Sequence, residues 1–141
     1  MNAEDSMDIQ REKEEASLAG ERALRSLYEA RNALSSAGNW GLLDIFTSGG
    51  GGLFSTIMKH SKLNTAQSAL QRARYDLDVF NRELKDVSET IGNIEMSEFL
   101  TFFDYMDSFI AEIMVQKRIS DMKGAVERAI DQVERILRRL N

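Results

Sequence analysis

The fold is decided by residues 66–91, AQSALQRARYDLDVFNRELKDVSETI, in which apolar side chains recur at alternating intervals of four and three residues. The series consists of Ala66, Leu70, Ala73, Leu77, Phe80, Leu84, Val87 and Ile91. A second series has the same spacing and consists of Val115, Ile119, Met122, Val126, Ala129, Val133, Ile136 and Leu140. This spacing is typical of helices that pack nearly parallel with interlocking side chains. It predicts two long helices, over residues 65–91 and 97–140.

A third series near the start of the chain predicts another helix, over residues 5–37. Most of its members are small, which allows two helix backbones to approach closely. They are Ala16, Gly20, Ala23, Leu27, Ala30, Leu34 and Ala37. The chain contains no proline, so the residue that most strongly interrupts long helices is missing. We therefore expect an all-α protein.

Helix lengths suggest how the middle of the chain is used. A helix over residues 97–140 would be about 65 Å long, whereas the helix over residues 65–91 would cover only about 40 Å of it. Helical extensions within residues 39–63, turning at Gly49–Gly52, would cover the remainder. The sequence thus predicts a single domain, residues 1–141: an elongated antiparallel three-helix bundle, similar to a coiled coil, with a glycine-rich helical hairpin as its tip.

Local signals suggest where the helices begin and end. Gly38-Asn39 indicates a break or a kink in the first helix. Asn64 indicates the start of the second helix, and Gly92-Asn93 its end. The third helix presents two different apolar faces before and after Val115. It is expected to be continuous or gently kinked there, because no helix breaker is present.

Composition narrows the classes of function. The formal net charge is -5, so we expect no nucleic-acid partner, and Arg135, Arg138 and Arg139 are read as cations that complement the end of a helix. There is no cysteine, which excludes disulfides and thiolate metal ligands. Residues 1–15 are charged and mostly polar, unlike a secretion signal. We expect a cytoplasmic protein.

No group of residues completes a catalytic or metal site. The glycine run is not followed by Gly-Lys-Ser/Thr, and it is interpreted as a turn rather than a phosphate-binding loop. His60 is the only histidine, and no partner is identified for it. Asp104, Asp107 and Glu112 belong to no Glu-x-x-His motif, and Asp104 and Asp107 are interpreted as solvated side chains. We therefore assign no catalytic, metal-binding or cofactor-binding residue, and expect no cofactor.

The tip is the candidate site of interaction. Its charge-free run from Ile45 to Met58 is 14 residues long, short of the roughly 17–25 that a membrane-spanning helix needs. The simpler interpretation of the tip is a hydrophobic cap packed against the third helix, and the alternative is a surface for a partner or a membrane. Its candidate residues are Trp40, Leu43, Asp44, Phe46, Phe54, Lys59 and His60.

Three motifs connect the chain with a known group of proteins. They are Asn39-Trp40-Gly41-Leu42-Leu43-Asp44-Ile45-Phe46, Gly50-Gly51-Gly52 and Lys59-His60-Ser61. In these motifs the chain resembles a family of uncharacterised bacterial helical proteins, and the similarity extends through the second helix. The resemblance implies a bacterial helical fold. The family has no assigned function, so the resemblance carries no site.

Three functions follow as hypotheses. The first is a non-enzymatic helical interaction or scaffold module that binds a protein partner or a second copy of itself, because nearly all recognisable information in the sequence specifies helix packing. The second is a membrane-active protein that uses the apolar tip, residues 39–58. The third is binding of a small ligand near His60, for which no partner residues that would complete a ligand site are identified.

Overall fold

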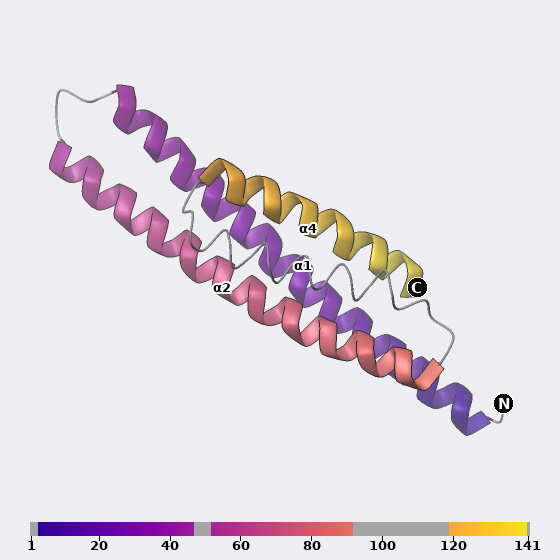
Figure 1. Ribbon diagram of the computed structural model, residues 1–141. Helices are drawn as coiled ribbons and strands as arrows, with labels where there is room; N and C mark the ends of the chain where they lie inside the picture. The colour runs from indigo at the N-terminus through magenta and orange to yellow at the C-terminus, as the bar shows by residue number, and fades with distance from the viewer. Residues whose placement is uncertain (1–2, 47–51, 92–118, 141) are drawn as a thin grey trace.

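A computed structural model describes residues 3–46, 52–91 and 119–140, and it describes their side chains over residues 6–37, 64–88 and 119–140. The three described segments are the helices α1 (Ala3–Phe46), α2 (Gly52–Ile91) and α4 (Ile119–Leu140). α1 packs against both α2 and α4. Every residue of these segments is helical, which confirms an all-α bundle (Figure 1).

The first two helices are longer than their apolar series alone indicates. α1 continues to Phe46 and α2 begins at Gly52, so helical extensions on both sides of the glycine run are confirmed. Of the two alternatives at Gly38-Asn39, the break is wrong, because α1 continues through both residues. The predicted start at Asn64 is also wrong, because this residue lies inside α2. A glycine within a helix costs only about 1 kcal/mol relative to alanine, and packing along a long seam outweighs that cost. α2 ends at Ile91, as predicted.

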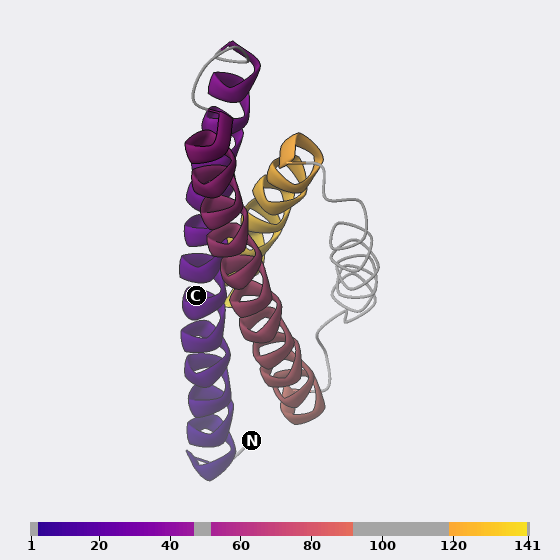
Figure 2. The ribbon, with the colours of Figure 1, turned by 90° about the vertical axis from the view of Figure 1, so that its left-hand side faces the viewer.

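α1 and α2 form an antiparallel hairpin. Ser26 of α1 donates a hydrogen bond to Asp76 of α2, and Arg72 of α2 forms an ion pair of 3.0 Å with Glu29 of α1. Higher residue numbers in one helix therefore pair with lower numbers in the other. Figures 1 and 2 show the two helices side by side, with their linked ends together.

α4 also runs antiparallel to α1, and hence in the same direction as α2. Its Glu134 accepts a hydrogen bond of 2.6 Å from Tyr28 Oη, while Leu137 lies over Gly20. The sequence predicts one continuous helix over residues 97–140 that is antiparallel to the second helix. Such a helix would run parallel to α1. The direction of α4 differs from this expectation, because α4 is antiparallel to α1. Residues 97–118, including the expected bend at Val115, lie outside the described residues.

The buried core follows the three apolar series. Every member whose side chain is described is buried, except Ile119 and Leu140, which are partly buried and pack against the core. In α1, every second member of the buried series is an alanine, and these alanines are seven residues apart: Ala16, Ala23, Ala30 and Ala37. The corresponding buried series in α2 is Ala66, Ala73, Phe80 and Val87. Small side chains on α1 allow its two neighbours to approach closely.

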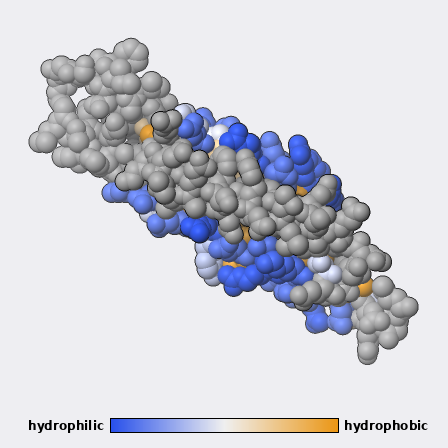
Figure 3. Space-filling model, viewed as in Figure 1, coloured by the Kyte–Doolittle hydropathy of each residue, from blue (hydrophilic) through white to orange (hydrophobic). Residues whose placement is uncertain are grey.

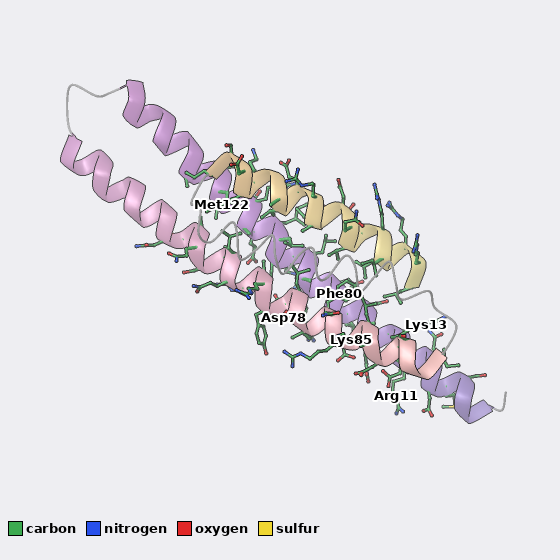
Figure 4. All side chains as sticks on the ribbon, in the orientation of Figure 1. Arg11, Lys13, Asp78, Phe80, Lys85 and Met122 are labelled. Carbon is green, nitrogen blue, oxygen red and sulfur yellow. The ribbon has the colours of Figure 1, made fainter. Side chains whose placement is uncertain are left out.

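The three helices approach one another closely at Gly20. A Cβ atom at this position would lie 2.7 Å from Leu137 Cδ2 and 2.9 Å from Phe80 Cε1. Phe80 is completely buried, and Figure 4 shows it in the middle of the bundle, away from both ends of the hairpin. Glycine at this position thus admits the aromatic ring of α2 and the leucine of α4 onto α1 at the same point.

The described surface is largely hydrophilic, with only small apolar areas on the face shown in Figure 3. Among the side chains that the structure describes, the large apolar ones that are exposed are Met7, Leu18 and Tyr75, and they are well separated in the sequence. Within the described residues, no helix is long and apolar enough to cross a membrane.

Candidate functional site

The seven candidate tip residues lie on both helices of the hairpin, next to the turn. Trp40, Leu43, Asp44 and Phe46 belong to the last turns of α1, whereas Phe54, Lys59 and His60 belong to the first turns of α2. In both ribbon views this end of the hairpin extends beyond the start of α4 (Figures 1 and 2). The structure therefore brings together two segments that are separated in the sequence by the glycine run. Their side chains lie outside the described part of the structure.

The register of the hairpin places Asp44 and Lys59 in corresponding positions. Asp44 follows Ala37 by seven residues, and Lys59 precedes Ala66 by seven residues. Ala37 and Ala66 are the members of the two buried series closest to the turn. Because the helices are antiparallel, Asp44 and Lys59 occupy the next register positions of these two series. The sequence thus has an acid and a base at the positions that follow the two alanines toward the turn. His60 directly follows Lys59.

The opposite end of the hairpin contains an acidic cluster that the sequence did not reveal. The carboxylates of Glu12, Glu15 and Glu83 lie within 4.8 Å of one another, the first two from α1 and the third from α2. Basic side chains lie at the same end, including Arg11, Lys13 and Lys85 in Figure 4. Arg11 pairs with Asp8 at 2.8 Å. Only the antiparallel register brings Glu83 to the two α1 carboxylates, so the spacing of Glu12 and Glu15 alone did not indicate the cluster.

Burial raises the pKa of Glu83 above its ordinary value, and the negative charges of Glu15, Asp86 and Glu12 raise it further. Carboxylate oxygens are ligands that Mg²⁺ and Ca²⁺ accept. Three neighbouring carboxylates between partly exposed helices are nevertheless common without an ion, and we assign no metal to them.

The polar contacts between the described helices join one helix to another. Tyr28 has a raised pKa, first because its hydroxyl donates to Glu134 and then because the residue is partly buried. Arg31 lies 4.7 Å from the centre of the Tyr28 ring, a cation–π distance. These groups link α1 to α4 on one side, as Ser26–Asp76 and Glu29–Arg72 link α1 to α2 on the other.

A shallow depression of about 320 Å³ lies beside the end of α4, lined by Gln10, Lys13, Glu14, Ser17, Leu18 and Leu140. It is open to solvent, so it has no enclosed surface for a small molecule. The arginines at the end of α4 include Arg138 and Arg139 in its last turn, where cations complement the helix dipole. Asp104, Asp107 and Glu112 lie outside the described residues.

Comparison of the chain with models of protein families, with curated proteins and with solved structures gave no match.

Proposed function

We propose that this chain is a non-enzymatic helical interaction module whose described bundle is a stiff support and whose hairpin tip makes the contact. The observation that carries the support role is the use of buried side chains. Within the described residues, Ser26 is the one buried polar side chain, and its hydroxyl is used to join α1 to α2. The other buried residues are apolar or glycine and serve helix packing. Catalytic sites, in contrast, gather polar groups in a concave pocket.

The contact role of the tip is supported by its place and its composition. The tip lies at the end of a hairpin whose α1 helix is about 66 Å long, and it extends past α4 in both ribbon views (Figures 1 and 2). Its sequence is rich in large apolar residues, whereas the described surface is largely hydrophilic. Large apolar patches on soluble chains commonly mark sites of interaction.

Stability measurements separate a contact surface from a packed cap. We consider a double substitution, Phe46→Ser with Phe54→Ser, and a matched control, Leu18→Ser with Tyr75→Ser, at exposed positions of the same two helices. If the tip is a contact surface, both variants should retain the free energy of unfolding of the original chain, measured in urea, to within about 0.5 kcal/mol per site. Only the tip variant should also lose binding of a hydrophobic dye.

A packed cap predicts the opposite result. Removing two buried phenylalanines would cost about 3–5 kcal/mol each, and the original chain would bind little dye at the tip. That outcome would refute the contact role of the tip, but it would not contradict the assignment of the helical bundle.

A further inference from the structure

α4 is buried over more of its circumference than α1 covers. Its contacts with α1 lie around Glu134, which bonds to Tyr28, and Leu137, which lies over Gly20. Another set of buried residues lies about 140–180° around the helix from Glu134 and about 80–120° from Leu137. A single neighbouring helix does not cover both sides, so α4 has a second neighbour on this side. The set consists of Ala125, Ala129 and Ile136.

α2 is buried in the same way. Asp76, which accepts a hydrogen bond from Ser26, marks the side of α2 that is turned toward α1. The buried series Leu70, Leu77 and Leu84 lies about 80–120° around the helix from Asp76. Among the described residues the backbones of α2 and α4 do not approach each other, so these two helices are not packed neighbours. The three leucines of α2 and the three buried residues of α4 form what we term the α2–α4 face.

The group that covers the α2–α4 face belongs to this chain. Each of its six side chains is at most 7% exposed in the single chain. Outside the described helices, the chain has residues 1–2, 47–51, 92–118 and 141. Only residues 92–118 are long enough to cover a face that extends over several helical turns.

The course of the chain from α2 to α4 fits the same segment. The Ser26–Asp76 pair places Ile91, the end of α2, about level with Arg11 of α1. The contacts of Tyr28 and Gly20 with α4 place Ile119, its start, level with about residues 38–43 of α1. Residues 92–118 therefore travel about 45 Å back along the bundle. A helix over residues 97–113 would cover about 25 Å, and the remaining residues up to about 33 Å more.

The apolar side chains of this segment complement the α2–α4 face. They are all large and recur on one side of a helix, whereas α4 presents two alanines, and large side chains against small ones fill an interior densely. We propose that residues 97–113 bind to the α2–α4 face as a fourth helix, antiparallel to α2 and α4. This inference concerns the support and does not depend on the contact role of the tip. The inward series would be Phe99, Phe103, Met106, Ile110 and Ile113.

Disulfide formation in the full chain tests the proposal, because the chain has no cysteine of its own. Ala125→Cys is combined with Met106→Cys or with Ile110→Cys, since a reversal of the chain at residues 114–118 brings these positions about level with Ala125. The matched control combines Ala125→Cys with Ser108→Cys, which lies about 160° around the same helix from both.

Under mild oxidation of dilute protein, at least one of the two pairs should form a bond within the chain about tenfold faster than the control. The inference is overturned if neither pair reacts faster than the control. It is also overturned if the bonds form only between two chains, which would indicate that a second copy supplies the segment.

Stability provides a second measurement. Phe103→Ala should lower the folding equilibrium constant at least about a hundredfold in urea denaturation, because it removes a buried ring. Ser108→Ala, on the outer side of the same segment, should change that constant less than about threefold. An equally small effect of both substitutions would contradict the fourth helix. Neither substitution alters the tip, so dye binding there still tests the proposed function separately.

Discussion

Substitution of Gly20 by alanine tests whether the three helices meet as closely as the structure indicates. A Cβ atom there would lie 2.7 Å from Leu137 Cδ2 and 2.9 Å from Phe80 Cε1, both shorter than real Cβ contacts. Leu137 is only partly buried and can move its terminal methyl group. Phe80 is completely buried, so its ring cannot move without disturbing the core. Overpacking of this kind costs about 1–3 kcal/mol.

The intrinsic helix preference of alanine opposes this cost. Replacing glycine within a helix by alanine gains about 1 kcal/mol, so we expect Gly20→Ala to destabilise the protein by about 1 kcal/mol net. Gly124 of α4 is the matched control, because a Cβ atom there would meet nothing within 4 Å. Gly124→Ala should stabilise the protein by about 1 kcal/mol. Urea denaturation, followed by far-ultraviolet circular dichroism, would measure both values. The close packing at Gly20 is refuted if the two alanine variants are stabilised equally.

Three further predictions concern the seam between the helices. Leu77→Ala and Leu84→Ala should each cost about 2–5 kcal/mol in the same denaturation assay, because both leucines are buried; Leu18→Ala at an exposed position should stay within about 0.5 kcal/mol, and a similar loss there would contradict the assigned core. Ser26→Ala should cost no more than about 1 kcal/mol for the lost bond to Asp76, whereas Ser26→Leu should cost about 1–3 kcal/mol from overpacking, so equal losses would argue against close α1–α2 contact. The pKa of Glu83 is raised, so the folded protein holds this proton more tightly than the unfolded chain does. The stability that protonated Glu83 contributes is therefore present at acidic pH and is lost as the pH rises above the ordinary glutamate range. Glu83→Gln should therefore raise the urea midpoint near pH 7 and leave it unchanged below about pH 4, whereas Glu127→Gln, at an exposed position of α4, should change neither; equal effects of the two substitutions would exclude carboxylate repulsion at Glu83.

Helix packing was predictable where local spacing determines it. The alternating intervals around Leu77, Phe80 and Val133 identified buried residues correctly, because a helix with that spacing has one continuous apolar face. The extension of α1 and α2 into the tip was predicted correctly, but from the length of a helix over residues 97–140, whose described part, α4, begins at Ile119 and does not reach the tip. The break at Gly38-Asn39 was predicted wrongly because its evidence was local, whereas the helix is held by packing along its whole length.

Register and direction were not predictable in the same way. The alanine series of α1 is compatible with several alignments of α2, because each seven-residue step presents another small side chain. The alignment is fixed by features that occur once, such as the position of Gly20 beneath Phe80 and the bond between Ser26 and Asp76. The acidic cluster depends on that alignment and therefore could not be found from Glu12 and Glu15 alone.

The same alignment changes how the tip residues are interpreted. From the sequence alone, a packed cap is the simpler interpretation of the apolar residues around the glycine run, and an exposed surface is the alternative. Once the register is fixed by Ala37 and Ala66, the next positions of the two buried series are Asp44 and Lys59, and Phe46 and Phe54 lie 14 residues from the exposed residues Asn32 and Ser68. Charged residues in a buried series are costly, so the register is an argument for a contact surface over a packed cap. The stability of the Phe46→Ser with Phe54→Ser variant decides between the two.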